Sequence, residues 1–113
     1  MTGIICLDKP CDMTSFMAVK RASRILGVKK AGHTGTLDPM ATGVLVLCIN
    51  KGLKIVNEIT ALDKEYEAEI TLGINTDTLD ITGNTISTKE VNVTNEDIDR
   101  VLKTFIGDYD MEV

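Results

Sequence analysis

The sequence has few aromatic residues and no long apolar run. Among 113 residues there is no tryptophan, with two phenylalanines and two tyrosines, so the core must be aliphatic. No apolar run approaches the roughly 20 residues that a membrane-spanning helix needs. The first eight residues, MTGIICLD, lack a basic leader, so we expect no signal peptide. The hydrophobic fraction of 43% is typical of a folded chain, and the length allows one domain at most.

Histidine and cysteine are too scarce for the common metal and disulfide sites. One histidine cannot form a zinc site with the scattered Cys6, Cys11 and Cys48. Three cysteines also make no even framework and no Cys-x-x-Cys pair, so we expect free or buried thiols in a reducing cytoplasm. Asp77 and Asp80 lack the spacing of a calcium loop, and we expect a loop hydrogen-bonded through its Thr and Asp side chains.

Several catalytic motifs are also absent. The sequence contains no Walker A pattern and no Gly-x-Gly-x-x-Gly. A Ser-His-Asp triad could combine His33 with Ser15, Ser23 or Ser87, but none of these serines lies on a nucleophile elbow. Nucleotide-binding loops and hydrolase triads are therefore set aside.

Basic residues are concentrated in the first half of the chain. The formal net charge is −5, which argues against a polyanionic partner. Residues 1–57 nevertheless carry eight Lys or Arg and three Asp or Glu, whereas residues 58–113 carry four and fourteen. A polyanion can therefore be drawn to one face. Five cations fall within residues 20–30, and they form either a solvated helix face or a surface that contacts phosphates. These cations are Lys20, Arg21, Arg24, Lys29 and Lys30.

The spacing of apolar residues predicts short strands interleaved with helices. Strands are expected at residues 4–7, 44–49, 64–72 and 85–91, and helices at residues 14–26, 53–62 and from 94 to about 106. The run at 44–49 suits a strand buried on both faces, and 64–72 alternates like a half-buried strand. No closing element is expected in residues 108–113. Without strict β-α-β alternation, the fold class is α+β, with a mixed, largely antiparallel sheet and flanking helices.

A Gly-rich segment at residues 32–43, GHTGTLDPMATG, lies between these elements. Its composition is also that of an ordinary connecting turn. Asp38, between Leu37 and Pro39, is the one carboxylate placed to act as a base or nucleophile. Tyr66 is read either as a core tyrosine with a wet hydroxyl or as a stacking residue.

The segment GHTGTLDPMATGVL at residues 32–45 resembles the catalytic motif of the TruB family of tRNA pseudouridine-55 synthases at nearly every position. Three further blocks are similar to that family in order and spacing. They are LDKP at residues 7–10 followed by Thr14-Ser15, KEY at 64–66, and, in the loop that follows, Leu72-Gly73, Thr76-Asp77-Thr78, Asp80 and Gly83. The last block favours the bacterial tRNA enzymes over their guide-RNA relatives in archaea and eukaryotes.

The resemblance implies an enzyme that isomerises uridine 55 in the T loop of tRNA to pseudouridine, without a cofactor or metal. Asp38 is the implied catalytic aspartate, and attack at uracil C6 or at ribose C1′ stays open. The target base must leave its stack to be reached. His33 would fill the space that it leaves, Tyr66 would stack on the uracil, and Lys9 and Pro10 would support the pocket floor. The implied substrate-binding residues are His33, Tyr66, Lys9, Pro10, Gly32, Thr34 and Gly35.

The sequence departs from the family pattern in two ways. Asp12 stands where the family usually has glycine. The family also continues beyond the matching part, with an arginine that pairs with the catalytic aspartate, further strands and a small RNA-binding domain. We therefore expect residues 1–113 to be the N-terminal portion of a pseudouridine synthase catalytic domain, with little activity alone. The alternative is a non-catalytic module that binds RNA or self-associates through unpaired sheet edges.

Overall fold

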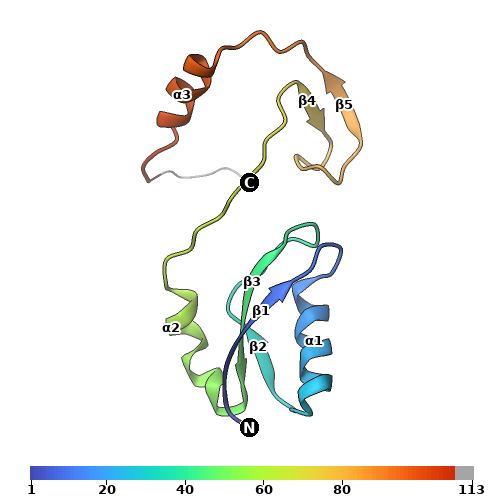
Figure 1. The fold of residues 1–113 in the computed structure, drawn as a ribbon, viewed down its shortest axis with the longest axis vertical. Helices are drawn as coiled ribbons and strands as arrows, with labels where there is room; N and C mark the ends of the chain where they lie inside the picture. Colours follow the sequence, from blue (N-terminus) through green and yellow to red (C-terminus); the bar gives the residue numbers. More distant parts are fainter. Residues whose placement is uncertain (109–113) are drawn as a thin grey trace. The chain divides into compact units, whose positions relative to one another are not determined.

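The computed structural model of the chain describes residues 1–108 and has the expected α+β class (Figure 1). It divides into two compact units, Met1–Glu67 and a second unit that begins at Ala68. The strands of residues 1–108 pair only antiparallel, in one three-stranded and one two-stranded sheet. None of the helices in this part of the chain could cross a membrane. The expectation for the tail falls, from residue 109 on, outside the described residues.

The first unit is built on a sheet of three strands in the order β1-β3-β2. Strands β1 (Gly3–Lys9) and β2 (Ala31–His33) both pair with the central strand β3 (Gly43–Ile49). The predicted strands at 4–7 and 44–49 are thus confirmed. Strand β2 was not expected, because three residues that include a glycine show no readable alternation.

Strand β3 forms the centre of the core. Its residues Leu45, Leu47, Cys48 and Ile49 are at most 2% exposed, as predicted for a strand covered on both faces. Val44 departs from the prediction and is exposed, because it lies at the end of the strand beside the Gly-rich loop. Burial raises the pKa of the Cys48 thiol. All three cysteines are free, and Cys6 and Cys11 are exposed.

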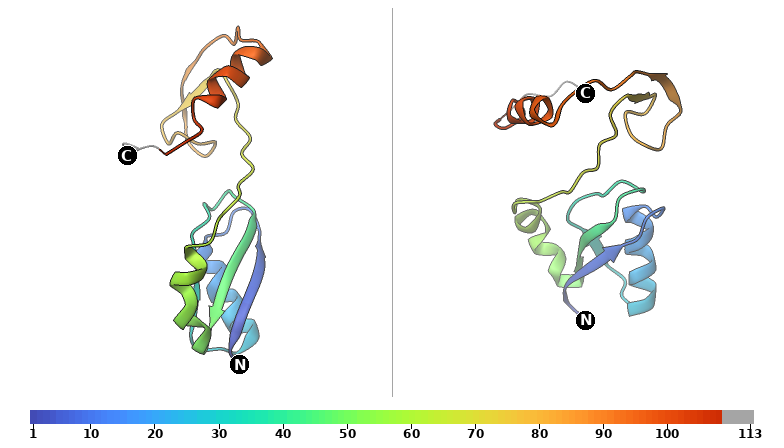
Figure 2. Two further views of the ribbon diagram at one scale, coloured as in Figure 1. Left: turned by 90° about the vertical axis from the view of Figure 1, so that its left-hand side faces the viewer. Right: turned by 45° about the horizontal axis from the view of Figure 1, so that its top comes forward.

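Helix α1 (Ser15–Leu26) covers one face of this sheet (Figures 1 and 2). Its predicted bounds are confirmed. The Thr14 side chain caps the first turn by accepting the Met17 N–H, and Gly27 ends the helix with a φ of 69°, a conformation that glycine adopts without strain. Ala18 and Val19 pack against Leu45 and Leu47 to form the buried cluster.

The opposite face of the sheet carries a 3-10 helix, η1 (Asn50–Ile55), and a short helix, α2 (Val56–Thr60) (Figure 2). The predicted helix at 53–62 therefore starts earlier, as a 3-10 turn, and ends sooner. Neither piece has a side-chain N-cap, which removes the local signal that would fix its start.

Residues 64–72 do not form the predicted half-buried strand. They form no strand up to Thr71, and the chain enters a turn at Leu72. Tyr66, Ile70 and Leu72 are 68%, 72% and 48% exposed. A strand needs a hydrogen-bonded neighbour and a surface for its apolar side, and nothing in residues 1–108 pairs with this segment.

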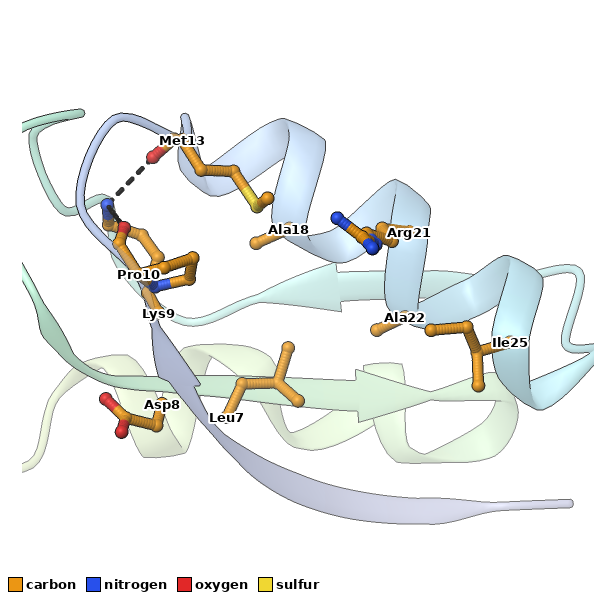
Figure 3. Close-up of a pocket in the computed structure, with 9 residues that line it drawn as sticks. All are labelled: Leu7, Asp8, Lys9, Pro10, Met13, Ala18, Arg21, Ala22 and Ile25. Atoms are coloured by element: carbon orange, nitrogen blue, oxygen red, sulfur yellow. Dashed lines mark hydrogen bonds between the residues drawn. The ribbon is translucent and has the colours of Figure 1, made fainter.

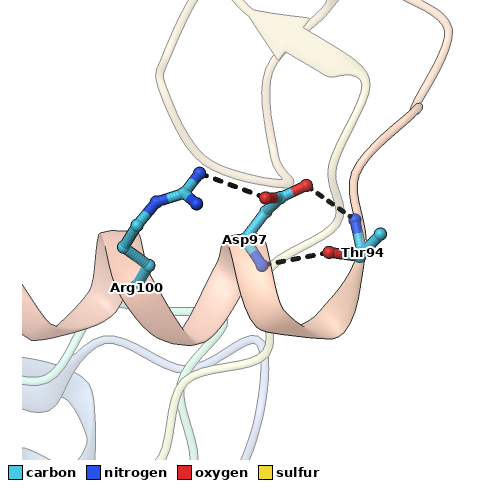
Figure 4. Close-up of polar contacts among 3 residues, drawn as sticks. All are labelled: Thr94, Asp97 and Arg100. Atoms are coloured by element: carbon cyan, nitrogen blue, oxygen red, sulfur yellow. Dashed lines mark hydrogen bonds and ion pairs between the residues drawn. The ribbon is translucent and has the colours of Figure 1, made fainter.

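The second unit contains a hairpin and one helix. Strands β4 (Ile74–Thr76) and β5 (Thr85–Thr88) pair antiparallel, so β4 lies inside the segment predicted to be a loop and β5 is shorter than predicted. Helix α3 (Asn95–Lys103) starts as expected at a Thr94–Asp97 capping box (Figure 4). None of its residues is buried in the described part of the chain.

Candidate active site

The loop after β2 places Asp38 at the first position of a tight turn. The Ala41 N–H donates to the Asp38 carbonyl at 2.9 Å, and Pro39 occupies the second position, where its fixed φ is favoured. The loop is anchored where it leaves β2, because the buried Thr34 donates its N–H to the Val46 carbonyl at 3.0 Å. The Asp38 side chain is exposed, and no ion pair holds it within residues 1–108.

Lys9, the last residue of β1, connects this turn to the strand through hydrogen bonds. Lys9 is 0% exposed, and its ammonium donates to the carbonyls of Pro10 and Met13 at 2.8 Å (Figure 3). It also donates to the carbonyl of Pro39 at 3.1 Å. A lysine ammonium has three donors, so each is matched to one backbone acceptor. Lys9 therefore supports the loop from inside the protein, and no donor remains for a phosphate or a base.

The segment after Lys9 holds the same loop through further hydrogen bonds. The Asp12 N–H donates to the Pro39 carbonyl at 2.8 Å, and the Cys11 thiol donates to the Met40 carbonyl at 3.2 Å. Asp12 has a φ of 63°, the left-handed conformation that favours glycine. The structure thus brings together the LDKP block and the Gly-rich loop, which are separate in the sequence.

His33 lies at the start of the loop and is half-buried. Its Nδ1 is 2.8 Å from the Gly35 carbonyl oxygen, which only accepts, so Nδ1 carries the proton in the neutral ring and Nε2 is an acceptor. Gly35 has a φ of 144°, and a Cβ built there would lie 3.8 Å from Cε of Lys64. Lys64, the first residue of the KEY block, is thus a cation beside the loop, and the sequence analysis gave it no role of its own.

Tyr66 is not joined to Asp38 or His33 by any hydrogen bond among the described residues. Its ring is exposed on the unpaired segment that follows α2. The core interpretation of Tyr66 is therefore wrong for this structure. Its stacking role stays a prediction.

The cations predicted on the first helix are all exposed, and none forms an ion pair within residues 1–108. Arg21 also borders an open cavity of about 240 Å³ between β1 and α1. Apolar side chains of Leu7, Met13 and Ile25 line the cavity, and Asp8 also contributes to its lining (Figure 3). These unpaired charges are available to a polyanion.

The loop between β4 and β5 uses its carboxylates internally. Asp77 Oδ1 accepts from Asn84 N–H at 2.9 Å. Asp80 Oδ1 accepts from the Thr82 hydroxyl at 2.5 Å, the Thr78 hydroxyl at 2.7 Å and the Thr82 N–H at 2.8 Å. The three bonds to Asp80, led by the one from the Thr82 hydroxyl, lower the pKa of Asp80. The hydrogen-bonded interpretation of this loop is confirmed. No cluster of three metal-ligating side chains occurs among the described residues.

Comparison with known proteins defines the class of this chain. The sequence profile described as "TruB family pseudouridylate synthase (N terminal domain)" matches residues 23–113. Proteins named tRNA pseudouridine synthase B are similar over nearly the whole chain. The one from Clostridium novyi is 47% identical over 108 residues, 96% of this chain and 37% of its own length. The one from Bacillus subtilis is 45% identical over 109 residues, 95% of this chain and 35% of its own length.

The chain therefore belongs to the TruB family of pseudouridylate synthases, and it spans little more than a third of the length of these relatives. Two solved structures share 45% sequence identity with part of it. An H/ACA RNP bound to a substrate RNA containing 2'-deoxyuridine matches 50% of this chain and 18% of its own, with a TM-score of 0.48. A Cbf5-Nop10-Gar1 complex matches 49% and 17%, with a TM-score of 0.47.

Proposed function

We propose that this chain supplies the aspartate-bearing part of a site that converts uridine 55 in the T loop of tRNA to pseudouridine. The observation that carries the proposal is Asp38, exposed at the first position of a turn whose backbone is fastened to the core. Family membership and the names of the relatives support the reaction. A tRNA substrate would place the protein in the cytoplasm.

The proposed reaction is an isomerisation that needs no cofactor. The N1–C1′ bond of uridine breaks, the base turns, and a C5–C1′ bond forms. C5 then loses its proton and N1 gains one, so atoms and electrons balance with no oxidant or reductant. Asp38 would act on the reacting nucleotide, at uracil C6 or at ribose C1′. Asp38 lies on a turn whose backbone is hydrogen-bonded to Lys9 and Asp12. This supports the role, because a reacting group must be presented in a fixed geometry.

The residues around Asp38 would hold the extruded nucleotide. His33 would fill the space that the base vacates, with its ring fixed by the bond to Gly35. Tyr66 would stack on the uracil, since aromatic rings hold unstacked bases. Gly32, Thr34 and Gly35 would shape the pocket wall, and Pro10, with the ammonium of Lys9, its floor.

The exposed cations of α1 and the turn after it would bind the tRNA backbone. Lys20, Arg21, Arg24, Lys29 and Lys30 carry charge that no acidic neighbour in residues 1–108 neutralises. Phosphate contacts of this kind supply most of the sequence-independent affinity for RNA. The T arm is the part of tRNA that this site would approach.

We also propose that residues 1–113 are the N-terminal portion of a catalytic domain and have little or no activity alone. Two observations support this. No cation pairs with Asp38 in the described residues, although an opposite charge would favour the ionised carboxylate. The chain also matches little more than a third of the length of its relatives. In a single-turnover assay on unmodified tRNA, turnover equal to that of the Bacillus subtilis relative would contradict this.

A transplant tests the site itself. The matched part of the Bacillus subtilis relative is replaced by this chain, and the hybrid is incubated with unmodified tRNA. We expect pseudouridine to form, Asp38→Asn to abolish it, and Asp63→Asn, another exposed aspartate of the first unit, to leave it unchanged. Equal turnover by the Asp38→Asn hybrid would refute the proposal.

The exposed apolar surface favours a second candidate, a non-catalytic module that binds RNA or self-associates. Strand β1 is an edge strand, and edge strands readily pair with other chains. Ile4 on β1 is 46% exposed, and Phe105 after α3 is 70% exposed. If the chain self-associates, light scattering should detect oligomers, and Ile4→Lys should convert them to monomers. If the chain is a non-catalytic RNA-binding module, Asp38→Asn should not change its affinity for tRNA. A monomer at high concentration counts against self-association.

A further inference from the structure

The hydroxyl of Ser15 contacts the Gly-rich loop at the residue before Asp38. Ser15 is the first residue of α1 and is 2% exposed. Its Oγ donates to the Leu37 carbonyl at 3.1 Å and accepts the Leu37 N–H at 2.9 Å, although the two residues are 22 positions apart. A serine hydroxyl offers one donor and two acceptor sites, so one side chain satisfies both backbone groups of Leu37.

The residue after Asp38 is held from the same segment of chain. The Pro39 carbonyl accepts from the ammonium of Lys9 at 3.1 Å and from the N–H of Asp12 at 2.8 Å. Asp38 therefore lies between two backbone positions that residues 9–15 hold in place. Its own carbonyl closes the turn to Ala41, while its carboxylate remains exposed.

We propose that Ser15 is a positioning residue for Asp38. Its hydroxyl fixes the peptide of Leu37, and with it the direction from which the Asp38 carboxylate meets a substrate. The burial of Ser15 leaves water little access to replace the hydroxyl, so its loss leaves both backbone groups of Leu37 without a partner. What Asp38 does to the substrate rests on the proposed function, but the positioning can be measured without RNA.

Amide hydrogen exchange, measured by NMR on the 113-residue chain, tests this directly. The Leu37 amide reports the bond to Ser15, and the Ala41 amide reports the turn that begins at Asp38. The Ala18 amide, which donates to the Thr14 carbonyl, reports the first turn of α1. In Ser15→Ala we expect Leu37 and Ala41 to exchange about tenfold faster, while Ala18 and the amides of β3 keep their wild-type rates.

The same helix offers a matched control. Ser23 is also a serine of α1, but its Oγ donates to the Val19 carbonyl at 2.8 Å and does not contact the loop. Ser23→Ala should therefore leave the Leu37 and Ala41 rates unchanged. If Ser15 served only to start the helix, Ser15→Ala would accelerate Ala18 and spare Ala41, and the proposal would be overturned.

A second variant covers the case in which Ser15→Ala accelerates every amide because it unfolds. Ser15→Cys nearly preserves the volume of the side chain and replaces the hydroxyl by a weaker hydrogen-bonding group. We expect Leu37 and Ala41 rates between those of the wild type and of an unprotected loop, with Ala18 unchanged. Wild-type exchange at Ala41 in Ser15→Cys would overturn the proposal. Pseudouridine formation that persists in the Asp38→Asn hybrid would instead refute the proposed function and leave these rates standing.

Discussion

Asp12 is one of three non-glycine residues in the described chain with a positive φ, and it is the one that contacts the Asp38 turn. Its φ of 63° lies in the left-handed region, which costs most non-glycine residues roughly 1–2 kcal/mol. The conformation persists because the N–H of Asp12 donates to the Pro39 carbonyl of the Asp38 turn. The strain is therefore held at the candidate site and offset by the contacts around it.

We expect Asp12→Gly to raise the free energy of unfolding by about 0.5–1 kcal/mol. The relief of backbone strain exceeds the extra entropy that glycine loses on folding, which is roughly 0.5–1 kcal/mol. Asp12→Ala is the control, because it removes the same charge but keeps a Cβ, and it should not stabilise the protein. Urea denaturation measures both variants. Equal stabilisation by the two variants would show that charge, rather than backbone strain, is responsible.

The hydrogen bonds that join residues far apart in the sequence are the part of the site that could not be predicted. The resemblance implied a supporting role for Lys9 at the pocket floor, and the catalytic role that it implied for Asp38 stays a prediction. The sequence alone could not show that the three donors of Lys9 are all used, nor that Ser15 reaches Leu37 across 22 residues. Such contacts depend on how α1 and β1 pack, so they cannot be predicted from the local sequence pattern.

At the scale of the elements, local sequence signals predicted which segments form helices and the central strand. They did not predict which strands find a hydrogen-bonded partner. Helices α1 and α3 carry their own caps at Thr14 and Thr94, and β3 is a continuous apolar run. The alternation at residues 64–72 is equally clear, yet that segment is unpaired. A strand depends on a neighbour, and the sequence pattern of the segment says nothing about whether one is available.

The capping box of α3 predicts a response to one substitution. Thr94 accepts the Asp97 N–H at 3.1 Å, and the Asp97 carboxylate accepts the Thr94 N–H at 3.1 Å (Figure 4). The helix has nine residues and none is buried in the described part, so it depends on this cap. Thr94→Ala should cost about 1 kcal/mol of helix stability and lower the Cα secondary shifts of α3. Unchanged shifts would contradict the capping role.

The same box predicts a dependence on pH. Backbone and side-chain hydrogen bonds with Thr94, followed by the bond from Arg100, lower the pKa of Asp97. A carboxyl with a lowered folded pKa stabilises the fold above its unfolded pKa, near 3.9, and this stabilisation is lost as the pH falls through the folded pKa. We expect the Cα shifts of α3 to decline below about pH 4. Asp97→Asn should weaken that decline, whereas Asp99→Asn should not.

At the scale of the whole molecule, the separation of charge allows an acidic protein to bind a polyanion. The net charge is −5, yet residues 1–57 carry a large excess of basic residues, and the cations at 20–30 are exposed and unpaired within the described chain. Net charge alone would have excluded RNA. The distribution of charge along the chain instead supports RNA as a binding partner.

The salt dependence of tRNA binding tests this distribution. If Arg24 neutralises one phosphate, Arg24→Ala should reduce the slope of log K against log salt by roughly 0.7–0.9. Arg100→Ala removes a cation that is already paired with Asp97 at 3.1 Å, and it should leave the slope unchanged. Fluorescence anisotropy with a labelled T-arm hairpin measures both slopes. Equal changes in the two variants would mean that the effect is one of total charge.

The central claim is that Asp38, at the first position of the turn at residues 38–41, acts on uridine 55. Its most direct test is to map pseudouridine at single-nucleotide resolution in tRNA treated with the hybrid in which this chain replaces the matched part of the Bacillus subtilis relative. We expect modification at position 55, and none there when Asp38 is replaced by asparagine. Modification at position 55 that persists in Asp38→Asn, or that occurs only at other uridines, would contradict the account.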